Sequence, residues 1–85
     1  MYKVKKYGAT WCKYCDTVDA LLKELNIPYE DIDVDDPEHF EECRNFNIIP
    51  VLRFYDDDGN LVASHVGEIG KTHLLKLVNG TKKEK

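Results

Sequence analysis

The chain has 85 residues, of which 42% are hydrophobic and 33% are charged, and its formal net charge is −4. This length and balance predict one globular domain and exclude a disordered or collagen-like chain. The negative charge argues against nucleic acid or an anionic membrane surface as the main partner. The first six residues lack the apolar stretch of a signal peptide, and no run approaches the roughly 18 apolar residues of a membrane span. We therefore expect a cytoplasmic protein.

The first part of the chain alternates strand and helix patterns. Residues 2–7 are rich in Val and Tyr and predict a strand, which Gly8 ends. Residues 13–25 predict a helix, because their apolar positions recur at i, i+3, i+4 and i+7. Residues 29–34 predict a second strand. The apolar stripe of the helix consists of Val18, Leu21, Leu22 and Leu25.

A second helix and a hairpin are predicted next. Asp36, followed by a proline, is a suitable N-cap, and we expect a helix from there to about residue 46. Residues 51–55 and 61–65 predict two antiparallel strands, and the Asp-Asp-Gly-Asn sequence at 57–60 predicts the tight turn between them.

A last helix is expected from about residue 71 to the Asn-Gly pair at 79–80. Residues 1–80 would then form the domain and residues 81–85 a disordered, solvated tail. The predicted order is β-α-β-α-β-β-α, an α/β fold. Strand–helix–strand units favour parallel pairing and the hairpin adds antiparallel pairing, so we expect a mixed four-stranded sheet flanked by three helices.

Cys12 and Cys15 form a Cys-x-x-Cys unit between the first strand and the first helix. A thiol at the start of a helix faces unpaired N–H groups and the positive end of the dipole, which favours its thiolate. Lys13 adds a positive charge. Cys15 lies one turn deeper and is expected to be more shielded. The pattern predicts that Cys12 attacks a substrate disulfide and that Cys15 resolves the mixed disulfide.

A zinc site is the alternative use of these thiols. Three thiols and one imidazole make an acceptable tetrahedral set. The gap between the two halves of this set holds a whole helix and a strand, unlike the short loop of a small zinc module, so redox chemistry is preferred and no metal is predicted. The clustered aspartates fit no calcium loop and are expected in caps and turns. The zinc set would be Cys12, Cys15, His39 and Cys43.

Residues 11–15 (Trp-Cys-Lys-Tyr-Cys) resemble the active site of the thioredoxin superfamily, with the Trp as in thioredoxin and the Tyr as in glutaredoxin. Residues 48–50 (Ile-Ile-Pro) resemble the strand start that carries the cis-proline, and residues 66–67 resemble the segment that flanks the substrate groove. The resemblance covers nearly the whole chain and implies a thioredoxin-like fold of glutaredoxin size. It also implies a substrate surface that consists of Trp11, Lys13, Tyr14, Ile49, Pro50 and Gly67.

The chain departs from both families at informative positions. Lys6 stands where thioredoxins usually place a buried Asp that moves protons for the second cysteine. By strand parity a helix covers Lys6, and we hypothesise that its charge lowers the pKa of Cys15. Glutaredoxins usually carry a basic residue at the position of Ala9, a Thr at Ile48 and a second Gly at Glu68. The glutathione-binding set is therefore largely missing.

The resemblance implies a monomeric thiol–disulfide oxidoreductase that needs no cofactor, because the electrons reside in the two thiols. Its substrates would be protein disulfides, ribonucleotide reductase among them, bound as an extended segment near Ile49. Thioredoxin reductase or glutathione would supply electrons, and thioredoxin reductase is expected to be the better donor. The alternative in the same class is a glutathione-dependent glutaredoxin.

Overall fold

Four strands form one mixed sheet in the computed structural model, which describes residues 3–81. The order across the sheet is β2-β1-β3-β4, with β1 parallel to β2 and antiparallel to β3, and with β4 antiparallel to β3. This arrangement confirms the predicted mixed sheet. The strands are β1 (Lys3–Gly8), β2 (Glu30–Asp33), β3 (Val51–Tyr55) and β4 (Leu61–Val66).

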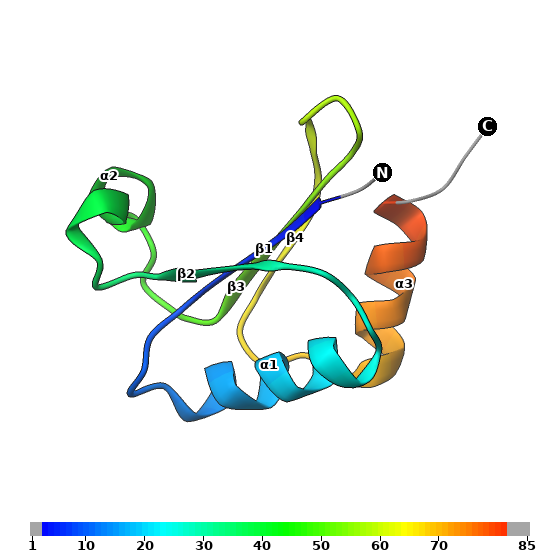
Figure 1. Cartoon of the computed structure of the whole chain (residues 1–85), viewed down its shortest axis with the longest axis horizontal. Coiled ribbons are helices and arrows are strands. Elements are labelled where there is room, and N and C mark those ends of the chain that lie inside the picture. Colours follow the sequence, from blue (N-terminus) through cyan, green and yellow to red (C-terminus); the bar gives the residue numbers. More distant parts are fainter. Residues whose placement is uncertain (1–2, 82–85) are drawn as a thin grey trace.

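Helices cover both faces of this sheet (Figure 1). α1 (Lys13–Glu24) and α3 (Lys71–Thr81) lie on one face, where Val18, Leu22, Leu74 and Val78 pack against Val4, Leu52 and Phe54. The 3₁₀ turn η1 (Pro37–His39) and the short α2 (Phe40–Cys43) lie on the other. Within the described part of the chain, no helix is both long enough and apolar enough to cross a membrane.

The second helix begins as predicted but ends early. The Asp36 carboxylate accepts a hydrogen bond from the backbone N–H of Glu38 (3.0 Å), as expected of an N-cap. The α-helix stops at Cys43, about three residues before the predicted end. The asparagines at 45 and 47 are weak helix formers because their side chains compete for backbone hydrogen bonds. Phe46 lies beyond the helix, and its ring still packs edge-on against Tyr7, with the centroids 5.0 Å apart.

The predicted end of the last helix at residues 79–80 is wrong. α3 continues to Thr81, whose hydroxyl donates to the carbonyl of Leu77 (2.8 Å) and whose side chain is buried. Burial and this hydrogen bond hold the last turn in place despite Gly80, since tertiary contacts override weak local propensity. The rest of the predicted tail, residues 82–85, lies outside the described residues.

Candidate active site

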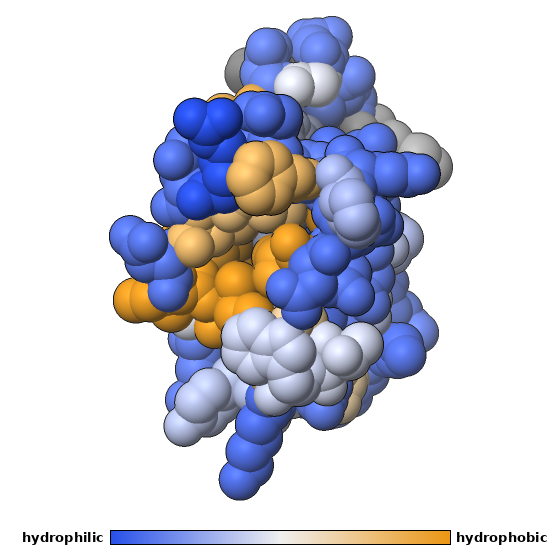
Figure 2. Space-filling model, turned by 90° about the vertical axis from the view of Figure 1, so that its left-hand side faces the viewer, coloured by the Kyte–Doolittle hydropathy of each residue, from blue (hydrophilic) through white to orange (hydrophobic). Residues whose placement is uncertain are grey.

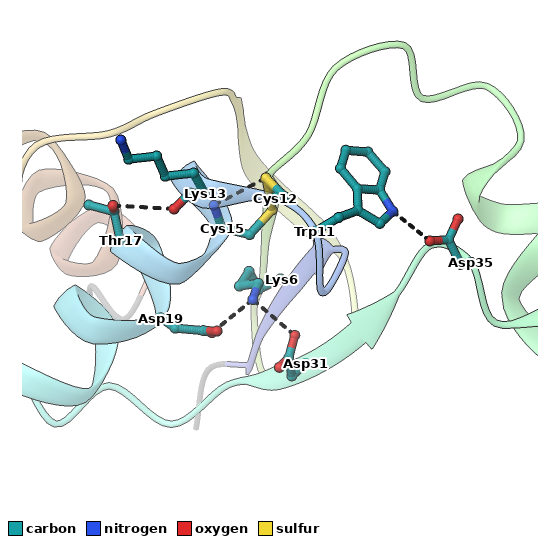
Figure 3. Close-up of a disulfide and its surroundings, with 9 residues drawn as sticks. All are labelled: Lys6, Trp11, Cys12, Lys13, Cys15, Thr17, Asp19, Asp31 and Asp35. Carbon is teal, nitrogen blue, oxygen red and sulfur yellow. Dashed lines mark hydrogen bonds and ion pairs between the residues drawn. A yellow bond between two sulfur atoms is a disulfide. The ribbon is translucent and has the colours of Figure 1, made fainter.

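The two cysteines form a disulfide at the point where β1 ends and α1 begins (Figure 3). Cys12 is the N-cap of α1, and its sulfur accepts a hydrogen bond from the backbone N–H of Cys15 (3.2 Å). Cys12 is 7% exposed, and Cys15 is 1% exposed. The predicted positions are confirmed: Cys12 lies at the helix start, and Cys15 is the more shielded of the two.

An exposed aromatic side chain stands beside the disulfide. Trp11 is 69% exposed, and its indole N–H donates to the carboxylate of Asp35 (2.8 Å), which fixes the ring next to the sulfurs (Figure 3). Tyr14 is also exposed, on the first turn of α1. The Lys13 side chain extends away from the sulfurs (Figure 3), so its charge is less well placed to favour the Cys12 thiolate than the sequence suggested. The contact between Asp35 and Trp11 was not predicted, because the two residues lie 24 positions apart in the chain.

The loop before β3 lies against the two cysteines and forms another part of the site. The Ile49–Pro50 peptide bond is cis, as the resemblance implied. Ile49 packs against the buried cluster that contains both cysteines. Gly67 has a positive φ of 93° and donates its N–H to the carbonyl of Pro50 (2.7 Å), which brings the end of β4 to this loop. Pro50 is itself fully buried, so it positions its neighbours rather than offering its ring to a substrate.

An apolar hollow continues from this loop over β3 and β4. It encloses about 250 Å³. Figure 2 shows apolar side chains gathered around a hollow on the side of the molecule where α2 lies in Figure 1. Ile48 is 60% exposed and Val66 is 55% exposed at its margin. Exposed apolar side chains of this kind, clustered together, mark binding surfaces. The hollow is lined by Asn45, Phe46, Asn47, Ile48, Val51 and Val66.

Lys6 lies beneath the disulfide and is 3% exposed (Figure 3). Its Nζ contacts Oδ1 of Asp19 on α1 (2.8 Å) and Oδ1 of Asp31 on β2 (3.1 Å). Asp19 also accepts a hydrogen bond from the Tyr29 hydroxyl (2.7 Å). Burial, followed by this hydrogen bond, raises the pKa of Tyr29, so the hydroxyl remains a donor. The prediction that a helix covers Lys6 is confirmed, whereas its two carboxylate partners were not predicted.

The four residues of the proposed zinc set do not come together. Cys43 is buried against Tyr7, Ile32 and Val51 on the α2 face, away from the cluster of the other two cysteines. Burial, with a smaller contribution from a neighbouring carboxylate, raises the pKa of the Cys43 thiol. His39 instead contacts a glutamate of α2. Among residues 3–81, no group of three or more His, Cys, Asp or Glu side chains is arranged to hold a metal ion.

Comparison with known proteins agrees with this geometry. The sequence model of the glutaredoxin family matches residues 2–56. Thioredoxin 3 of Plasmodium falciparum (isolate 3D7) is 38% identical over 56 residues, which are 61% of this chain and 31% of that protein. The chain thus spans about a third of the length of this curated relative.

Solved thioredoxin structures cover nearly all of the chain. The reduced thioredoxin pre-protein of Schistosoma mansoni superposes with a TM-score of 0.78 at 25% identity, covering 95% of this chain and 79% of that one. A mutant thioredoxin from Halobacterium salinarum NRC-1 superposes with a TM-score of 0.82 at 20% identity, covering 99% and 77%. At 20% identity, the similarity to the Halobacterium salinarum protein concerns the fold alone.

Proposed function

Because the chain belongs to the glutaredoxin family of the thioredoxin superfamily, we propose that it is a thiol–disulfide oxidoreductase that reduces protein disulfides. The observation that carries the proposal is the Cys12–Cys15 disulfide at the N-terminus of α1. The backbone N–H groups and the dipole of this helix stabilise a thiolate on Cys12. Cys15 lies behind it, out of reach of a large substrate but close enough to form the bond.

The reaction proceeds in two exchanges. In the reduced protein the Cys12 thiolate attacks one sulfur of a substrate disulfide, a mixed disulfide forms, and the other substrate sulfur leaves as a thiolate that takes a proton. The Cys15 thiol then loses its proton and attacks the sulfur of Cys12. The mixed disulfide breaks, the second substrate sulfur leaves as a thiolate, and the Cys12–Cys15 disulfide remains. Two electrons pass from the protein to the substrate.

The surface around the disulfide suits an extended substrate segment. Ile49 packs against the cluster that contains both cysteines, and we propose that a substrate segment pairs with its backbone as an added strand would. The hollow at Ile48 and Val66 lies next to this loop and has room for an apolar side chain. We therefore propose that good substrates carry an apolar residue near the reduced cysteine, with Trp11 covering the other side of the bond.

Thioredoxin reductase is the proposed electron donor. Ala9 packs into the buried cluster with the two cysteines, so no cation can reach glutathione from the position where glutaredoxins place one. Glu68 adds an exposed negative charge next to Gly67, which opposes an anionic tripeptide. The likeness to thioredoxins supports the same donor. We expect a potential between about −270 mV and the range of about −200 to −230 mV.

Initial rates of disulfide reduction, coupled to NADPH, test this proposal. Thioredoxin reductase should support faster turnover than glutathione with glutathione reductase, at matched protein concentration. Cys12→Ser should abolish activity, and Cys15→Ser should accumulate the mixed disulfide. Turnover with glutathione and none with thioredoxin reductase would make the protein a glutaredoxin in function. Activity that survives Cys12→Ser would overturn the proposed chemistry altogether.

The proposal also covers the cellular location, the oligomeric state and the partners of the protein. A dithiol of this kind is useful where the compartment keeps thiols reduced, which supports a cytoplasmic location. We propose that the protein acts as a monomer on large partners, ribonucleotide reductase among them. Cell fractionation and sedimentation test the location and the oligomeric state, and trapping with the Cys15→Ser variant tests the partner.

A further inference from the structure

A polar pocket opens beside Gly8, the residue that lies against the buried sulfur of Cys15. It encloses about 170 Å³ and reaches from the surface at β2 and α1 to the end of β1. Gly8 forms part of its wall, and a Cβ at Gly8 would lie 2.8 Å from the Cys15 sulfur and 3.1 Å from Cε of Lys6. The stem of Lys6 thus approaches the sulfur with only the glycine between them. The titratable side chains that line the pocket are Lys6, Asp16, Asp19, Asp31 and Asp33.

Gly8 stands between this pocket and the Cys15 sulfur, so the charges of the pocket lie close to the buried thiol. Cys15 is 1% exposed, yet it must lose a proton before it can attack Cys12. The thiolate that forms is sensitive to each charge that lines the pocket, because its sulfur is buried and solvent screens it little. From β1 the facing charge is the ammonium of Lys6, from α1 the carboxylates of Asp16 and Asp19, and from β2 those of Asp31 and Asp33.

The charge of Lys6 acts on the Cys15 sulfur together with the charges of two carboxylates. Its Nζ contacts two carboxylates, at 2.8 Å from Asp19 and 3.1 Å from Asp31. Asp19 is largely covered and is held by the Tyr29 hydroxyl as well, whereas Asp31 is 58% exposed on the edge strand β2. Loss of the Asp31 charge would therefore leave more of the Lys6 charge uncompensated, without removing a buried group.

We propose that Asp31 is a positioning residue for the second exchange: by balancing the buried charge of Lys6, it sets how readily Cys15 forms the attacking thiolate. This inference rests on the proposed function and extends it to a residue that does not touch the sulfurs. It also changes the hypothesis for Lys6, because the groups that act on Cys15 are the lysine together with its two carboxylates. Removing Asp31 and removing Lys6 should then have opposite effects.

Titration of Cys15 tests the inference without any substrate. In a Cys12→Ser, Cys43→Ser background, Cys15 is the remaining thiol, and the ultraviolet absorbance of its thiolate reports its ionisation. Asp31→Asn should lower the midpoint by about 0.5 pH unit, since the lost charge is partly exposed to solvent. Lys6→Met should raise the midpoint, because two carboxylates then face the sulfur uncompensated. Glu30→Gln is the matched control, one residue away on β2, where Glu30 contacts Lys3 (3.7 Å) instead.

The kinetic consequence is measured on the mixed disulfide. With Cys12 and Cys15 both present, Asp31→Asn should speed resolution at pH 7 roughly twofold, because the gain in thiolate exceeds the loss in its nucleophilicity. A midpoint for Asp31→Asn equal to that for Glu30→Gln overturns the inference, and so does a rise. The titration needs no turnover, so failure of the proposed function would appear separately, as missing disulfide reduction in the unmodified protein. If Lys6→Met does not fold, the comparison of Asp31→Asn with Glu30→Gln decides alone.

Discussion

Gly8→Ala should destabilise the oxidised protein although alanine is the better residue for an ordered backbone. Gly8 is the last residue of β1 and lies against the disulfide. The added Cβ would stand 2.8 Å from the sulfur and 3.1 Å from Cβ of Cys15, and 3.1 Å from Cε of Lys6. The sulfur is held by its bond to Cys12 and cannot turn away. The strand end or the first turn of α1 must therefore move.

The size of the loss follows from two opposing effects. Overpacking a well-filled site costs about 1–3 kcal/mol. The smaller conformational freedom of alanine in the unfolded chain returns about 0.4–1 kcal/mol. The free energy of unfolding should thus fall by about 1–2 kcal/mol, which for a domain of this size lowers Tm by roughly 5–15 °C.

Thermal unfolding of the oxidised protein, followed by circular dichroism, measures this change. Gly80→Ala is the matched control, because Gly80 lies in α3 and nothing would contact its added Cβ within 4 Å. That variant should gain about 0.5–1 kcal/mol of stability. A Gly8→Ala variant as stable as the unmodified protein, beside a Gly80→Ala variant that shows its gain, would refute the clash at Cys15.

Three further predictions concern titration and the third cysteine. In a Cys15→Ser variant the thiolate absorbance of Cys12 should titrate below the free value of ~8.5, within about 5–7.5, and a midpoint at or above ~8.5 contradicts the role of the helix N-terminus. Cys43→Ser should keep its disulfide reductase activity, and stoichiometric zinc in the reduced protein, together with lost activity in this variant, would favour a metal site instead. The hydrogen bond to Glu42 raises the pKa of His39, so the stability it contributes is complete below about pH 6.5 and is lost as pH rises through the raised value. Chemical denaturation across this window should show a decline that His39→Ala removes, and an unchanged decline in that variant would refute this assignment.

The parts of the site that local pattern controls were predictable from the sequence. The position of Cys12 depends on where one strand ends and one helix begins, and both ends carry strong local signals. The shielding of Cys15 follows from its place one turn into α1. Strand alternation places Lys6 on the same face as Val4, and both are buried under helices. Each of these features needs no knowledge of which segments meet in space.

The parts that depend on distant segments were not predictable. Asp31 reaches Lys6 because β2 pairs with β1 in a register that aligns these two residues. The sequence shows Asp31 as one of several clustered aspartates, and Asp33, Asp36 and Asp56 do serve in caps and turns as expected. Asp56, for example, accepts from the backbone N–H groups of residues 58 and 60. No local signal separates the aspartate that meets a buried lysine from those that close a turn.

The two cysteines therefore face different kinds of electrostatics. Cys12 meets backbone N–H groups at the start of α1, whose dipoles are fixed and do not change with pH. Cys15 is separated by Gly8 from a pocket in which the charges belong to ionisable side chains, with Lys6 held between two carboxylates. In the proposed mechanism, the fixed field keeps the first thiol ready to attack, whereas the balanced set of side chains controls when the second thiol becomes a thiolate. The proposed order of the two exchanges thus follows from the different charges that lie near each sulfur.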